Sequence, residues 1–138
     1  MDLLRAWTGA VVVLVCGSVI TTGLAVSAVV SDDDLKPVTG ALLWIALPAL
    51  IVFALTALAG ALLHPLPQRA DAGRHALAVL LVPGLATLLG IAVGIVQGSP
   101  AQSNAAGAVG GLLGAVATWW LLTRLRGRRT PRGGYTGY

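Results

Sequence analysis

Two histidines and an aspartate are the side chains best suited to chemistry in this chain. His64 and His75 flank the loop between the second and third apolar stretches, and Asp71 lies between them. A metal site or a His–Asp dyad can be drawn from them, but their spacing matches no established ligand pattern. No Ser, Thr or Cys stands beside a base in a nucleophile arrangement. The sequence therefore predicts a non-enzymatic protein without catalytic residues, metal ligands or a cofactor.

Hydroxyl side chains form a second candidate site in the middle of the first apolar stretch, at Ser18, Thr21 and Thr22. One interpretation is that they line the path of a solute. The other is that they donate hydrogen bonds to carbonyls of their own or a neighbouring helix, which are worth about 0.6 kcal/mol each inside a membrane. The second interpretation is the more common one and is favoured here.

Acidic side chains are concentrated in one short segment, Asp32–Asp34. Carboxylates are the ligands that divalent cations prefer, but acids just before a helix also stabilise its N-terminus, so a solvated turn is the simpler interpretation. The interiors of the four apolar stretches contain no Asp, Glu, Lys, Arg or His. Because proton relays and ion paths in membranes depend on such residues, the sequence argues against a proton-coupled carrier.

Composition explains why those stretches must lie in lipid. The chain has 138 residues, of which 57% are hydrophobic and only 10% charged, whereas soluble domains carry about 25% charged residues. The mean hydropathy is +0.87. Each stretch is about long enough to cross a bilayer as a helix. We expect an all-α, polytopic four-helix transmembrane bundle in one domain, 1–125, with short loops and spans at 6–30, 38–63, 76–97 and 105–125.

Basic residues are distributed unevenly along the chain and predict its orientation. Eight of the nine are arginines, and they fall in the head, in the loop between the second and third spans, and in the tail. All eight then share one side of the membrane, and only Lys36 lies on the other. By the positive-inside rule both termini are cytoplasmic, in a cell membrane. The preference for Arg, Ala and Gly suggests a bacterial chain from a high-GC genome.

The tail, residues 126–138, is expected to be basic, cytoplasmic and disordered. Arginines close to the inner leaflet attract anionic lipid headgroups at about 1 kcal/mol each. Nucleic-acid binding is a poor explanation for this charge, because topology already requires it there. The predicted contacts to anionic lipid are Arg124, Arg126, Arg128, Arg129 and Arg132.

Glycines provide the clearest packing signal, because small residues let membrane helices approach closely. In the fourth span they form two neighbouring bare ridges, and the third span carries a shorter one. Either both ridges close the monomer, or one of them meets a second chain, since two ridges exceed what one partner helix needs. The predicted helix-packing residues are Gly90, Gly94, Gly107, Gly110, Gly111 and Gly114.

These observations favour a non-enzymatic membrane protein that binds other membrane components, as an accessory or scaffold subunit or as a homo-oligomer. The bilayer itself and a larger membrane-protein complex are its expected partners. The alternative is a small transporter or pore for an uncharged or hydrophobic solute, using the hydroxyl cluster of the first span. A lipid-handling enzyme is a third and weaker hypothesis, for which no catalytic group can be named.

Overall fold

The computed structural model describes residues 2–28, 30–63 and 72–127, and these segments are helical with no strand among them. Four helices are long and apolar enough to cross a membrane, which confirms the expected all-α, four-helix membrane fold. The elements are α1 Asp2–Ser27, α2 Asp32–Leu35, α3 Val38–Ala41, the π-helical segment η1 Leu42–Ala46, α4 Leu47–Leu63, α5 Ala72–Val96 and α6 Ala101–Gly127.

The observed spans lie within a few residues of those expected from the sequence. The largest differences are at the first span, Leu3–Ser27, and at the start of the fourth, Ala101–Leu125. The fourth span begins early because Pro100 starts it: the carbonyl of Pro100 accepts the first hydrogen bonds of the helix, from the backbone of Ser103 and Asn104. The third span ends where Gly98 takes a positive φ of 68°, the conformation in which glycine commonly terminates helices.

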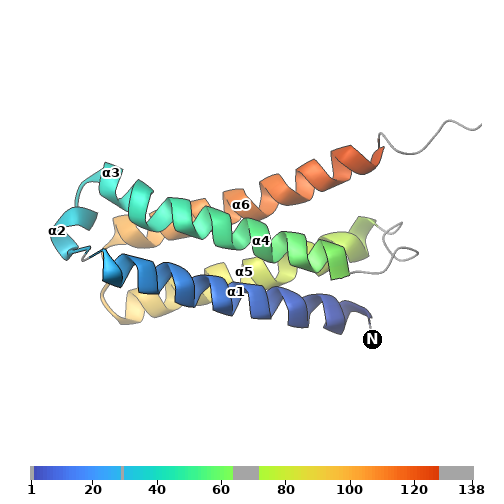
Figure 1. The fold of residues 1–138 in the computed structure, drawn as a ribbon, viewed down its shortest axis with the longest axis horizontal. Helices are drawn as coiled ribbons and strands as arrows, with labels where there is room; N and C mark the ends of the chain where they lie inside the picture. The colour runs from blue at the N-terminus through green and yellow to red at the C-terminus, as the bar shows by residue number, and fades with distance from the viewer. Residues whose placement is uncertain (1, 29, 64–71, 128–138) are drawn as a thin grey trace, which may run out of the picture.

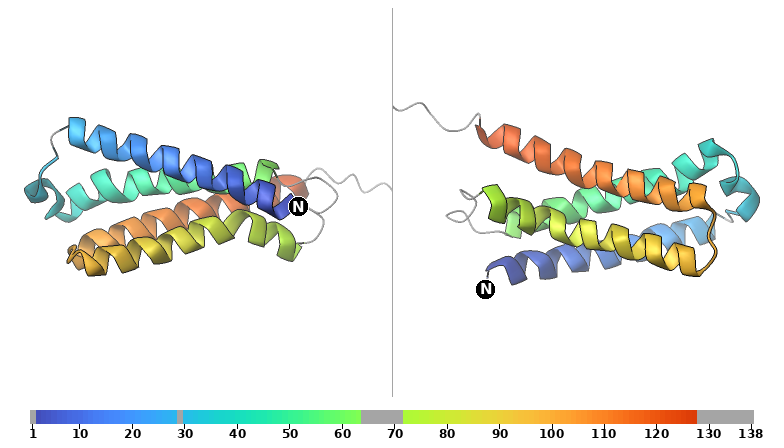
Figure 2. Two further views of the ribbon diagram at one scale, coloured as in Figure 1. Left: turned by 90° about the horizontal axis from the view of Figure 1, so that it is seen from below. Right: turned by 180° about the vertical axis from the view of Figure 1, so that it is seen from behind.

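The helices form two hairpins that face each other, α1 with the α3–η1–α4 rod and α5 with α6. The closest association is between α4 and α6, and α4 also packs on α1 and α5. In the left view of Figure 2 the two hairpins lie one above the other and diverge toward the end that carries α2. The N-terminus of α1 and the C-terminus of α6 lie at the opposite end (Figure 1).

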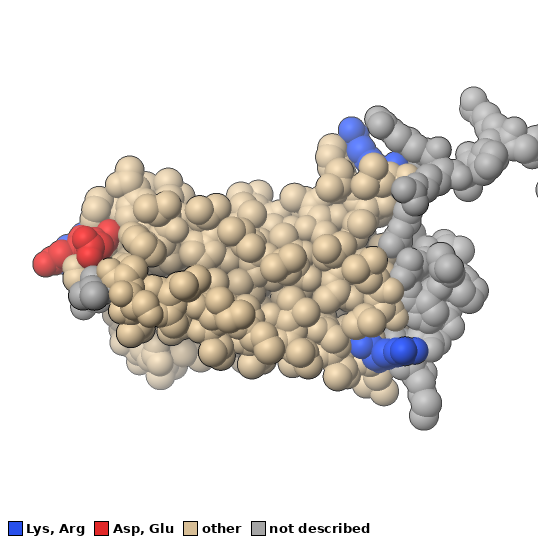
Figure 3. All heavy atoms as spheres, in the orientation of Figure 1, with Lys and Arg blue, Asp and Glu red and all other residues tan. Residues whose placement is uncertain are grey.

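Charge distinguishes these two ends (Figure 3). We call the end with Asp33, Asp34 and Lys36 the acidic end, and the end with Arg5 and Arg124 the arginine end. The long apolar surface between them is continuous with exposed aliphatic side chains, especially on α1. This is the pattern of a helical bundle whose sides contact lipid and whose two ends contact water.

Small side chains fill the core in the arginine half. Ala57 and Ala61 of α4 pack with Val79 of α5 and Ala115 of α6, and all four are buried. A Cβ added to Gly60 would lie 2.6 Å from the carbonyl oxygen of Ala78, so α4 and α5 touch there backbone to backbone. Since lipid provides no hydrophobic force between helices, such close van der Waals contact is what holds this half together.

Pro48 interrupts the second span, and the chain accommodates it in a specific way. Proline has no N–H and therefore cannot bond to the carbonyl of Trp44. Immediately before it the helix widens into the π-helical segment, in which the Leu47 N–H bonds to the Leu42 carbonyl. The donor that the Leu43 carbonyl would use in an α-helix is thereby redirected. A π-bulge of this kind often marks a functional site.

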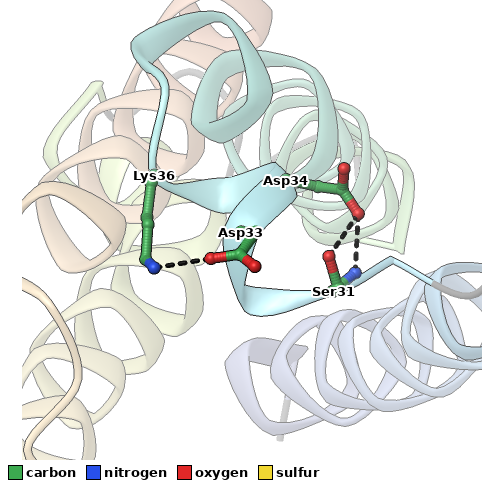
Figure 4. Close-up of polar contacts among 4 residues, drawn as sticks. All are labelled: Ser31, Asp33, Asp34 and Lys36. Carbon is green, nitrogen blue, oxygen red and sulfur yellow. Dashed lines mark hydrogen bonds and ion pairs between the residues drawn. The ribbon is translucent and has the colours of Figure 1, made fainter.

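The turn at the acidic end is organised by Asp34. Its carboxylate accepts hydrogen bonds from the backbone N–H and the hydroxyl of Ser31, at 2.8 and 2.7 Å (Figure 4). Asp33 instead pairs with Lys36. The carboxylates therefore serve the turn, as the simpler sequence interpretation expected, and within the described segments no group of three or more potential metal-ligating side chains occurs.

Asp34 predicts a pH dependence of this turn. The Ser31 backbone N–H, followed by the Ser31 hydroxyl, lowers the pKa of the Asp34 carboxyl below its ordinary value. A carboxyl with a lowered folded-state pKa stabilises the fold above its unfolded pKa and loses that effect as the pH falls through the folded value. We expect NMR titration to find the Asp34 pKa below that of a free aspartate, and Ser31→Ala to raise it. An unchanged pKa in Ser31→Ala would contradict the capping arrangement.

Candidate functional site

The two glycine ridges of α6 both face the second span. A Cβ added to Gly110 would overlap the carbonyl oxygen of Ala46, and one added to Gly114 would overlap that of Leu50. Both glycines are buried. Here α6 lies directly on the backbone of η1 and α4, so any side chain at these two positions would separate the helices.

The neighbouring ridge meets side chains of the same partner. A Cβ on Gly111 would come 3.0 Å from the ring of Phe53, and one on Gly107 would lie in ordinary contact, 3.5 Å from Ile45. Both ridges are thus used within one chain. One partner helix needs two ridges because it presents bare carbonyls to one and bulky side chains to the other.

The two predicted packing glycines of α5 have different surroundings. Gly94 is buried, and its missing side chain makes room for the amide of Asn104 on α6. Gly90 is exposed, and a Cβ there would meet nothing within 4 Å. The helix-packing role expected of Gly90 is therefore not seen within the chain, because α5 diverges from its neighbours at this level.

The arginines proposed for lipid contact lie at the end of α6. Arg124 is exposed, and its guanidinium stacks over the Trp120 ring at 3.9 Å. Arg126 belongs to the last turn of α6, which extends two residues beyond the expected boundary at 125. The remaining three, Arg128, Arg129 and Arg132, lie outside the described residues, as does the rest of the predicted disordered tail.

The histidines are separated by the limits of the description. His75 is buried in the first turns of α5, whereas His64 and Asp71 lie outside the described residues. At the same end, the Trp7 indole donates a hydrogen bond of 3.3 Å to the carbonyl of Leu77, which ties α1 to α5. The arginine end is therefore a closed, cross-linked part of the bundle.

The acidic half, in contrast, is hollow. One cavity of about 520 Å³ is lined by residues from all four spans, and a second of about 430 Å³ lies between α1 and the second span. Four side chains line both of them: Ser18, Ile45, Ala49 and Phe53. The two cavities are therefore adjoining parts of one space, which we call the intramembrane cavity. Its volume lies in the range of small-molecule binding sites, about 300–1,000 Å³.

Hydroxyl and amide groups line this cavity, together with apolar side chains. Thr21 and Thr87 already donate to carbonyls one turn earlier in their own helices, as the favoured interpretation of the hydroxyl cluster expected for Thr21. Their oxygens still offer lone pairs. The other polar members of the lining are Ser18, Thr22, Ser103 and Asn104.

Asn104 is the residue that the sequence did not single out. It lies in a short uncharged segment that reads as a turn, but it occupies the first turn of α6, against Gly94 and at the cavity wall. An intramembrane amide is costly unless it is used, and that cost is the only signal that could have identified it. None of the residues lining the cavity is charged.

These features define a class: a four-span integral membrane protein with an uncharged cavity in one half of the bilayer. The particular protein finds no relative, since no family model matches the chain and neither a similar curated protein nor a similar solved structure was found. Function must therefore be argued from the cavity itself.

Proposed function

We propose that this protein acts without catalysis, by binding an uncharged or weakly polar component of the membrane in the intramembrane cavity. The observation that carries the proposal is that one cavity is walled by all four spans and lined by hydroxyl and amide groups. A cavity placed between packed helices, mostly apolar and with a few polar groups, is the usual form of a small-molecule site.

The absence of charge in the lining supports an uncharged ligand. A charged group transferred into such a site without a counter-ion pays a large desolvation penalty. Neutral hydrogen-bonding groups match the lining better, because hydroxyls and amides both donate and accept. This favours the transporter or carrier alternative over a scaffold, although the core packing of the arginine half would have to open for transfer across the membrane.

The orientation forms part of the proposal. The arginine end faces the cytoplasm by the positive-inside rule, which places both termini there and the cavity in the opposite leaflet of a cell membrane. Arg124, stacked on Trp120, would bind anionic headgroups of the inner leaflet, since indole rings prefer the interface and guanidinium groups attract phosphate.

An accessory or scaffold role is the second candidate. The glycine ridges no longer support it, because η1 and α4 cover both of them. The specific observation in its favour is α1, whose exposed aliphatic residues form the least buried span of the four. A partner membrane protein or a second copy would have to bind there, and native gels of Val15→Trp and Val19→Trp variants would show whether it does.

Filling the cavity tests the main proposal. Ala49 is half-buried and lines both parts of the cavity, so Ala49→Trp should occupy the space a ligand needs. We expect photolabelling of cavity peptides by a diazirine-bearing long-chain alcohol to fall at least about tenfold, as loss of a buried site predicts. The readout is mass spectrometry of the labelled peptides.

The matched control is Ala92→Trp, which adds the same ring to an exposed position of α5 outside the cavity lining. It should label like the unmodified protein. Equal labelling of all lipid-facing helices, unaffected by Ala49→Trp, would show that the cavity is not a binding site.

A further inference from the structure

We infer that the cavity takes an amphiphile with an uncharged polar end, and that this molecule enters sideways from the bilayer between α1 and α5. The inference rests on the proposed function and deepens it by naming the ligand class and the route. Three features carry it: where the cavity opens, how polarity changes along it, and which charges are missing from it.

The opening is marked by exposed residues that nevertheless line the cavity. Ser18 on α1 and Leu89 and Gly90 on α5 are exposed to the surroundings of the bundle, whereas the lining residues of α6 are half-buried. In the left view of Figure 2, α1 and α5 lie close together at the arginine end and separate toward the acidic end. Because this side of the bundle faces lipid, the opening leads into the membrane.

Gly90 lies at this opening, where its lack of a side chain keeps the space clear. A Cβ there would meet nothing within 4 Å, so glycine is not required for packing. The expected role of Gly90 in helix contact is thus replaced by a role in access. Any larger side chain at Gly90 would project into the gap between the two helices without disturbing a contact.

Polarity changes along the cavity in the same direction as in a lipid molecule. Asn104 lies three residues into α6, about 5 Å from the start of that helix at 1.5 Å per residue. Phe53 lies 15 residues after Val38, about 22 Å from the acidic end of the second span. Polar groups therefore stand near the membrane surface and apolar ones near its middle, which suits an amphiphile of the adjacent leaflet.

The missing charges select among such amphiphiles. Since no cationic side chain lines the cavity, an anionic headgroup would lose its hydration without gaining a counter-ion. Lys36, the cation nearest in sequence to this end of the second span, is engaged by Asp33 in the exposed turn. A glycerol-type headgroup can instead share hydrogen bonds with Asn104 and the hydroxyls.

The experiment uses the full chain in phosphatidylcholine vesicles with one of two diazirine probes of equal chain length, a monoacylglycerol and a fatty acid at neutral pH. We expect the monoacylglycerol to label cavity peptides at least about tenfold more than the fatty acid. Gly90→Leu should lower that labelling at least about tenfold, and Gly23→Leu should leave it within about twofold. Gly23 is the control because it is also exposed and open within 4 Å, but lies outside the cavity lining.

The outcomes separate the inference from the proposal beneath it. Unchanged labelling in Gly90→Leu overturns the lateral route, and equal labelling by the two probes overturns the neutral headgroup, while binding itself stands. Cavity labelling by the long-chain alcohol but not by the monoacylglycerol also overturns the inference alone. Loss of both signals in the unmodified protein overturns the proposed function. Thermal unfolding of Gly90→Leu checks that the variant is folded.

Discussion

Replacing Gly114 by alanine is expected to destabilise the protein by about 1–3 kcal/mol, the usual range for overpacking a tight contact. The new Cβ would overlap the Leu50 carbonyl oxygen, and a backbone atom cannot rotate away as a side chain can. The two helices must then move apart along the closest contact of the bundle. Thermal or denaturant unfolding in detergent micelles, followed by circular dichroism, measures the change.

Alanine at Gly107 provides the matched control on the same helix. Its Cβ would meet only Ile45, in ordinary contact at 3.5 Å. Both substitutions improve the helix propensity of α6 equally, because alanine exceeds glycine by about 1 kcal/mol in water. Gly107→Ala should therefore be neutral or stabilising. If the two variants unfolded alike, α6 would not approach the second span in the way described.

Redistributing the basic charge is expected to invert a large fraction of the molecules. Exchanging the five tail arginines for asparagine leaves Arg5, Arg69 and Arg74 at the arginine end, and changing Asp32–Asp34 to lysine gives four cations at the acidic end. The bias in Lys and Arg between short loops sets orientation, so a majority bias of eight to one becomes three to four. No packing contact in the core is altered.

Labelling of single cysteines by a membrane-impermeant reagent measures this inversion, after Cys16 is replaced by alanine. A cysteine at Ser99 should react from outside in the unmodified arrangement and become protected in the recharged variant. The tail substitutions alone form the control, because three cations against one still favour the original orientation. Ser99 protected from outside labelling in the unmodified chain would reverse the proposed orientation, and with it the leaflet assigned to the cavity.

The sites show how far a sequence pattern can be interpreted. The bare ridges of α6 identified the helix that packs most closely, but not its partner, and they suggested a free ridge where none exists. Gly90 resembled Gly94 in the sequence, yet one is buried under Asn104 and the other stands at an opening. A glycine reports only the absence of a side chain, and its meaning depends on what approaches it.

The sequence by itself determined that the chain dissolves in lipid as four helices and which ends of them share a side, because uncharged stretches and arginine placement act through transfer energies that need no tertiary contact. Only the tertiary structure decided how each helix is rotated. Helices that are apolar on every face carry no amphipathic signal, and lipid is as apolar as the protein interior. Rotation is therefore settled by shape alone, and with it the hollow between Ser18, Ala49 and Asn104.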